Sequence, residues 1–216
     1  MAIPSRQIGW SAEDNLLWQI SKQLEQLTNV TAQACTNCTT TTSTTTLPVY
    51  KVFTALLTQS GGDDSRSITD GITTIGVSYT IANYVAGDFT IIGAPNNLVG
   101  TSFIATGIFP DWGLSFGSQL VFNFGAPVAT ILENTIGNIW FTYTGVGTYG
   151  VESNGLFIID KSLSIIGTPS EGVQNNNFAG VNFGGDSQFQ INVVEPAGVN
   201  IDDLLDRTPI EIRVYN

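Results

Sequence analysis

Residues 49–216 are organised by short runs in which apolar and polar positions alternate, or in which a few apolar residues follow one another. Gly, Pro, Asn and Asp separate these runs, as is typical of strands joined by turns. The pattern predicts a mainly β fold, with a β-sandwich or jelly-roll-like body of one or two subdomains. The runs cover residues 50–58, 76–85, 88–93, 101–109, 118–125, 138–145, 156–160, 162–167, 188–194 and 209–215.

The last of these runs alternates most regularly, and it places Ile210, Ile212 and Val214 on the face expected to meet the core. One helix is expected inside the β body, over residues 200–206. Asn200 would be its N-cap, with Asp202 and Asp203 in the first turn.

A different periodicity precedes the β body. Over residues 12–28 the apolar positions recur at helical spacing, which predicts a short amphipathic helix within an anchoring segment, residues 1–30. Such a short helix is marginal alone in water, so its apolar stripe is expected to be buried. Three partners stay open: the chain's own β domain, other copies of the chain, or another protein. The stripe consists of Leu16, Leu17, Ile20, Leu24 and Leu27.

Residues 31–48 form a low-complexity, Thr-rich segment between the helix and the β body. β-branched Thr favours extended backbone, so we expect a stiff, extended linker. The segment contains Cys35 and Cys38 in a lone CxxC motif. A redox CxxC is placed at a helix N-terminus after a strand, and that context is absent here. Free thiols or disulfides are the simpler interpretations.

A weak internal echo runs through the β region. Residues 79–95 and 143–169 both lead from Tyr-Thr to Ile-Ile-Gly-x-Pro. Two related halves, about 49–125 and 126–216, would explain the echo. The alternative is that Gly-x-Pro is common turn chemistry after a strand.

The amino-acid composition excludes more classes of function than any motif does. The chain has no His, so Ser-His-Asp, Cys-His and His-based zinc chemistry are excluded. The formal net charge of -11 argues against nucleic-acid binding, which needs clustered Lys and Arg. No signal peptide or membrane-spanning apolar segment is expected, so the protein is expected to be made in the cytoplasm.

The acidic residues give no specific catalytic signal. Loop pairs such as Asp63 and Asp64 are expected to be solvated carboxylates, with a calcium site as the minority interpretation. Two carboxylates can hydrolyse glycosides, but 18 acidic residues allow many pairs. We therefore expect no enzyme activity, no metal and no cofactor.

Trp112 is the one candidate ligand contact, because FPDWG (109–113) is typical of a turn and a turn aromatic is well placed to stack on a sugar. The alternative role for Trp112 is a plug in the core or in a subunit interface.

Three segments resemble virion structural proteins of tailed bacteriophages, especially of Bacteroidetes-infecting and crAss-like groups. They are the opening MAIPSRQIGWSAEDNLLWQISKQLEQLTNV, the stretch APVATILENTIGNIWFTYTGVGTYGV (126–151) and the closing TPIEIRVYN (208–216). The resemblance implies a non-enzymatic particle component: a head fibre or decoration protein, or a tail-associated fibre or adaptor. It also implies a virion location, self-association, often as a homotrimer, and other capsid or tail proteins as partners. The alternative is a carbohydrate- or receptor-binding adhesin module on the virion, with a host glycan as partner.

Overall fold

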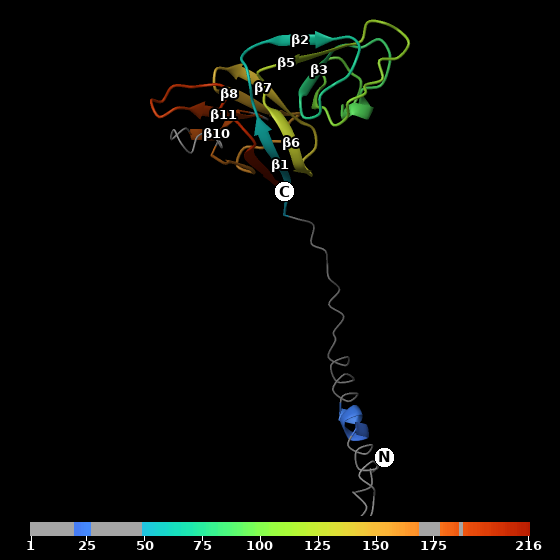
Figure 1. Cartoon of the computed structure of the whole chain (residues 1–216), viewed down its shortest axis with the longest axis vertical. Coiled ribbons are helices and arrows are strands. Elements are labelled where there is room, and N and C mark those ends of the chain that lie inside the picture. The colour runs from blue at the N-terminus through green and yellow to red at the C-terminus, as the bar shows by residue number, and fades with distance from the viewer. Residues whose placement is uncertain (1–19, 27–48, 169–177, 186–187) are drawn as a thin grey trace, which may run out of the picture. The chain divides into compact units, whose positions relative to one another are not determined.

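The computed structural model describes residues 20–26, 49–168, 178–185 and 188–216. The chain forms two compact units, Met1–Leu47 and Pro48–Asn216. In the first unit, residues 20–26 are helical. The second unit is a body of antiparallel strands (Figure 1). The expected mainly β fold with a sandwich body is therefore confirmed.

The described part of the β body contains twelve strands and one 3₁₀ turn, η1 (Thr90–Ile92). The strands are β1 (Tyr50–Thr58), β2 (Ser65–Ile68), β3 (Ser78–Asn83), β4 (Ser102–Ile104), β5 (Gln119–Asn123), β6 (Val128–Asn134), β7 (Ile139–Gly145), β8 (Thr148–Ser153), β9 (Ser162–Ile166), β10 (Phe178–Gly185), β11 (Gln188–Val194) and β12 (Thr208–Tyr215). They form three four-stranded sheets: β6-β1-β12-β9, β10-β11-β8-β7 and β2-β5-β3-β4.

The first sheet joins the two ends of the β body. In the β1–β12 ladder, Phe53 faces Ile212 and Ala55 faces Ile210, so the inward positions of both strands meet on one face. The amide of Asn216 donates to the carbonyl of Val49 at 3.1 Å, which places the C-terminus beside the start of β1 (Figure 1). The regular alternation of the last strand is confirmed, because Ile210, Ile212 and Val214 are all buried.

The second sheet packs face to face on the first to form the sandwich. Its inward side chains include Phe141 on β7, Val151 on β8 and Ile191 on β11, and all belong to one core with Phe53. The rings of Phe53 and Phe141 lie 6.3 Å apart between centroids. Because strand residues alternate, the neighbours of these side chains face away from the core. This alternation sets up the polar face described below.

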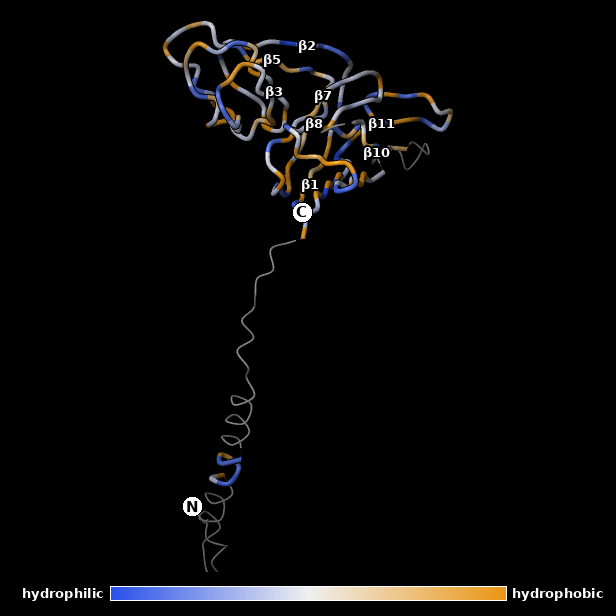
Figure 2. Tube along the Cα trace, turned by 180° about the vertical axis from the view of Figure 1, so that it is seen from behind, coloured by the Kyte–Doolittle hydropathy of each residue, from blue (hydrophilic) through white to orange (hydrophobic). Residues whose placement is uncertain are grey.

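The third sheet has a core of its own, which includes Tyr79, Ile81, Phe89 and Leu120. It is tied to the sandwich where the Phe141 amide donates to the hydroxyl of Ser78 on β3 at 2.8 Å. Its strand β2, with sequence SRSI, is hydrophilic over its first three residues (Figure 2), and only Ile68 packs against this core. This polarity explains why apolar patterning does not reveal β2.

The two cores divide the β body differently from the expected halves 49–125 and 126–216. The first core takes β1 together with strands from the second half, because β1 pairs with β12 and β6. The echo between residues 79–95 and 143–169 is not a structural repeat either. Ile91 lies in the 3₁₀ turn η1, whereas Ile165 lies in strand β9.

Three local expectations are wrong. Within residues 88–93 the chain forms the 3₁₀ turn η1 (Thr90–Ile92) instead of a strand, and the left-handed Gly93 (φ 107°) ends that turn. Residues 156–160 are not a strand, and the positive φ of Asp160 (66°) closes a turn there. The helix expected over 200–206 is absent, since Asp203 has φ 65° and interrupts any helical run. Four strands are not foreseen: β2, β6, β8 and β10.

Candidate functional site

The anchoring stripe is described only in part. Within helical residues 20–26, Ile20 and Leu24 lie one turn apart and are 47 % and 63 % exposed. Lys22 Nζ lies 3.7 Å from Glu25 Oε2. Outside the described residues lie Leu16, Leu17, Leu27, the Thr-rich linker (31–48), Cys35 and Cys38.

Trp112 is partly buried and packs against the third sheet's core, which limits the exposure expected of a turn aromatic. Its ring packs edge-on against Phe89, with centroids 5.3 Å apart. Its indole Nε1 donates to the carbonyl of Gly71 at 2.9 Å. The only N–H of the indole and one edge of the ring are therefore already engaged. This geometry favours the plug role over ligand contact.

Asp202 is the centre of the most connected polar network in the described residues. Its Oδ2 accepts a hydrogen bond from the Tyr143 hydroxyl at 2.8 Å. Its Oδ1 accepts from the Tyr149 hydroxyl at 2.9 Å and from the Gly147 amide at 2.7 Å. Instead of charging a helix terminus, Asp202 clamps the β7–β8 hairpin to the segment before β12.

Gln59 extends this network to the end of β1 and is only 3 % exposed. The Tyr149 hydroxyl, whose single proton is shared with Asp202 Oδ1, lies 2.8 Å from Gln59 Oε1. Gln59 Oε1 also accepts from the Asp203 amide at 2.7 Å. Its Nε2 donates to the carbonyls of Gly61 at 2.6 Å and Gly125 at 3.2 Å. A fully bonded buried amide of this kind fixes the loops that meet it.

The two tyrosines of the network are held in their neutral form. Burial, with the hydrogen bond to Asp202, raises the pKa of Tyr143 to about 12. Burial also raises the pKa of Tyr149 well above its usual value. Both hydroxyls are therefore protonated and act as donors at neutral pH. The network is suited to holding loops together.

The loop carboxylates Asp63 and Asp64 have local partners. Asp63 Oδ1 accepts from Asn123 Nδ2 at 2.6 Å, and Asp64 Oδ2 accepts from both Nε and Nη2 of Arg66 at 2.8 and 2.6 Å. Among the described residues, no group of three or more Cys, Asp or Glu side chains could hold a metal ion. The solvated-loop interpretation fits this geometry.

A second polar arrangement lies on the outward face of the sheet β10-β11-β8-β7. Strand register places Glu152 on β8 between Trp140 on β7 and Gln188 on β11. The next row places Gly150 beside Thr142. We call Trp140, Thr142, Glu152 and Gln188 the polar face.

The side chains of the polar face converge above Gly150. An ideal Cβ built on Gly150 would lie 2.7 Å from Glu152 Oε1 and 2.8 Å from Gln188 Nε2, and it would overlap Thr142 Oγ1. Thr142 Oγ1 donates to Glu152 Oε1 at 3.4 Å. Burial raises the pKa of Glu152, and the Thr142 hydrogen bond offsets part of that rise.

A groove runs along the edge of β7 beside the polar face. Its volume is about 410 Å³, and Trp140 and Thr142 belong both to its lining and to the polar face. The third sheet supplies the opposite wall through Ser65, Thr80 and Asn123. Val121, Phe122, Phe141 and Tyr143 complete the lining, so apolar and aromatic side chains form much of the groove beside the short hydroxyl and amide side chains.

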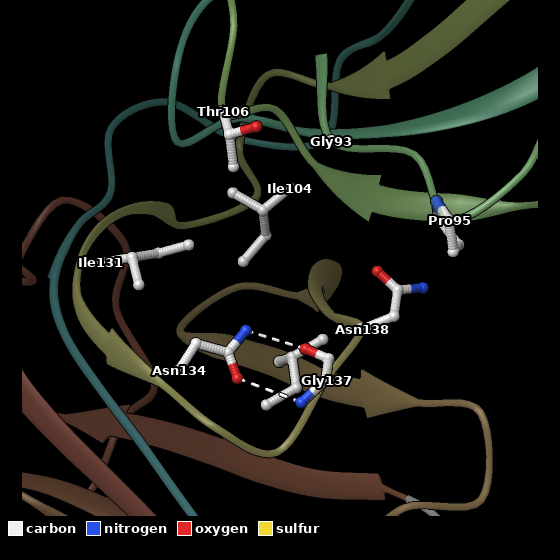
Figure 3. A pocket seen from close by; sticks show the side chains of 9 residues that line it. Gly93, Pro95, Ile104, Thr106, Ile131, Asn134, Gly137 and Asn138 are labelled. Atoms are coloured by element: carbon white, nitrogen blue, oxygen red, sulfur yellow. Dashed lines mark hydrogen bonds between the residues drawn. The ribbon is translucent and has the colours of Figure 1, made fainter. Parts of the chain in front are cut away.

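A smaller cavity of about 210 Å³ lies between the η1 region and the β6–β7 turn (Figure 3). Asn134 points across its floor and bonds its own turn, donating to the Gly137 carbonyl at 2.8 Å and accepting from the Gly137 amide at 3.1 Å. This side chain is therefore engaged within its own turn.

No protein-family model matches this chain, and no curated protein or solved structure shows significant similarity to it. Among the described residues, no helix has the length and apolar character needed to span a membrane.

Reasoning from sequence missed both polar arrangements. One signal for the polar face is visible in QFQINVV, where Gln188, Gln190 and Asn192 alternate with apolar residues. The alternation reveals a polar face on β11 but not the strands beside it. Nothing in the sequence links Gln59 with Asp202.

Proposed function

We propose that this protein is a non-enzymatic structural component of a bacteriophage virion. In this proposal the β body is the projecting module, and residues 1–30 attach it to copies of itself and to other virion proteins. The arrangement suits a homotrimeric head fibre or decoration protein, or a tail-associated fibre or adaptor.

The observation that carries the proposal is the exposed apolar pair Ile20 and Leu24. The pair lies in a unit separate from the β body, whose two cores are filled by side chains of the body itself. An apolar stripe on a short helix gains most by packing against equivalent helices. Self-association would bury the pair and hold several β bodies at high effective concentration.

A loop of the β body offers a second apolar contact. Leu114 and Phe116 are wholly exposed, in the segment just before β5. The Ser118 hydroxyl fixes the base of this loop by accepting from the amides of Val85 and Ala86 at 3.0 and 3.1 Å. Two large apolar side chains presented from a fixed base are suited to contact with a neighbouring subunit.

The sequence of the linker is compatible with this role. β-branched Thr disfavours compact structure, so a Thr-rich segment is suited to connecting an anchor with a projecting body. The resemblance of residues 1–30, 126–151 and 208–216 to phage virion proteins points in the same direction.

The test is the mass of the full chain in solution, measured by light scattering after size exclusion. We expect three times 23.1 kDa for the natural chain, and a monomer for Ile20→Asp combined with Leu24→Asp. The matched control, Ser21→Asp with Gln26→Asp, adds the same charge away from the stripe and should remain trimeric. An unchanged mass in the first variant contradicts self-association through Ile20 and Leu24.

The virion assignment has a test of its own. It requires peptides of this protein in gradient-purified phage particles, and their absence there contradicts it.

A further inference from the structure

The polar face and the β7 groove together carry an inference that goes beyond the virion proposal. All four side chains of the polar face are partly exposed. Glu152 and Gln188 are neighbours through strand pairing, and Thr142 Oγ1 donates to Glu152. Their polar atoms lie directly over Gly150, which has no side chain, and together form one compact polar cluster on the outward face of the sheet.

The donors and acceptors of this polar cluster suit the vicinal hydroxyl groups of a sugar. A carboxylate accepts two hydrogen bonds, an amide donates and accepts at once, and a threonine hydroxyl does either. A sugar ring with adjacent hydroxyls presents a complementary mixture of donors and acceptors. Trp140 lies beside these groups and is partly buried against the first core. The exposed part of its ring supplies an apolar surface for the C–H face of a pyranose ring.

Charge selects among sugars. None of the strands β7, β8, β10 and β11 carries Lys or Arg, and Glu152 makes the polar cluster acidic. The whole chain has a net charge of -11. Anionic sugars such as uronic acids would therefore be repelled, and a neutral hexose is favoured.

The groove gives room for more than one sugar ring. Its volume of about 410 Å³ continues from Trp140 and Thr142 towards Ser65, Thr80 and Asn123 on the third sheet. Pockets of this size hold small ligands, and its lining combines apolar and aromatic side chains with short polar ones.

We propose that the outward face of β7, β8 and β11, with the adjoining groove, binds a neutral glycan. Glu152, Gln188 and Thr142 bond the ring hydroxyls, and Trp140 packs on the sugar face. This site is distinct from Trp112, whose indole is engaged within its own core. The proposal does not depend on the oligomeric state or on the virion assignment, since all the named groups lie in one β body.

The experiment is native affinity electrophoresis of the full chain in gels containing a neutral polysaccharide: hydroxyethyl cellulose, xyloglucan, galactomannan or soluble starch. Polygalacturonate is the anionic comparison. We expect at least one neutral polymer to retard the protein in proportion to its concentration, and polygalacturonate to have no effect. Retardation by none of the neutral polymers overturns the proposal, as does retardation by polygalacturonate alone.

Variants locate the site. Glu152→Ala and Trp140→Ala should each weaken retardation at least tenfold, whereas Glu133→Ala, an exposed carboxylate on β6, should leave it unchanged. Gly150→Ala is a second probe that removes no polar group: its methyl displaces the three convergent side chains, and retardation should fall by a similar factor. Circular dichroism confirms that each variant is folded. Natural retardation in Gly150→Ala and in folded Glu152→Ala overturns the assignment to this face.

Discussion

The hydroxyl of Tyr149 donates a hydrogen bond to Oδ1 of Asp202 at 2.9 Å, although 53 residues separate them. The contact fixes the β7–β8 hairpin to the segment that leads into β12. Tyr149 is also completely buried, so its hydroxyl depends on Asp202 and Gln59 for partners. Removing Asp202 leaves the buried Gly147 amide without its acceptor, whereas the Tyr149 hydroxyl keeps Gln59.

Asp202→Ala should therefore destabilise the β body. The substitution removes the acceptor of the Tyr143 and Tyr149 hydroxyls and of the Gly147 amide. Hydrogen bonds to charged groups contribute about 1.5–3 kcal/mol, so we expect the free energy of unfolding to fall by about 3 kcal/mol. Urea denaturation measures it. Asp70→Ala, in an exposed loop, should change it by less than about 0.5 kcal/mol. Equal effects of the two substitutions would show that the clamp contributes nothing.

Alkaline pH should weaken the same network. The pKa of Tyr143 is raised to about 12 in the folded protein, from 10.0 for an unperturbed tyrosine. The unfolded chain therefore loses this proton at lower pH than the folded chain does. The stabilisation is complete below pH 10 and is lost as the pH rises towards 12.

This pH dependence is measured as the free energy of unfolding at pH 8, 10 and 11.5, in the natural chain and in Tyr143→Phe. The natural chain should lose stability across this window, and the variant should lose less, because Phe carries no ionisable group. Identical losses in the two proteins would assign the alkaline sensitivity to other groups.

Trp112 gives a prediction that separates its two candidate roles. As a plug against Phe89, it should contribute to stability. We expect Trp112→Phe to cost about 1 kcal/mol, through the lost bond to Gly71, and Trp112→Ala to cost about 2 kcal/mol because the ring is only half buried. Thermal or urea unfolding checks both values. Unchanged stability in Trp112→Ala would contradict the plug role and support a role for Trp112 in ligand contact.

Leu114 and Phe116 should act on association and not on folding. Their side chains are exposed, so Leu114→Ser with Phe116→Ser should shift the free energy of unfolding of the β body by less than about 0.5 kcal/mol. The trimer should dissociate at a concentration at least tenfold higher than for the natural chain. Sedimentation over a concentration series measures this shift. The matched pair Leu98→Ser with Val99→Ser, also exposed, should leave dissociation unchanged. A shift of the same size in both variants would mean that the loop has no special role.

The sequence by itself determined the class of the fold and the strands with the strongest patterns. The expected run 50–58 is β1 and the run 188–194 is β11, residue for residue. These strands can be predicted because their side chains alternate between core and solvent, and this periodicity is visible within each short segment of the sequence. The apolar run 88–93 was not a strand, because Phe89 and Ile92 are buried from a 3₁₀ turn, where residues three apart share a face.

Only the tertiary structure decided which strands are neighbours. β1 pairs with β12 across most of the β body, and this pairing moves β1 out of the half to which its position in the chain assigns it. The same kind of long-range pairing sets Gln188 beside Glu152 and brings Asp202 to Tyr143. Local periodicity predicts whether a side chain points to the core or to solvent. The register between distant strands determines which side chains it contacts. The physical reason is that pairing of distant segments is selected by burial of the whole core, to which every strand contributes at once.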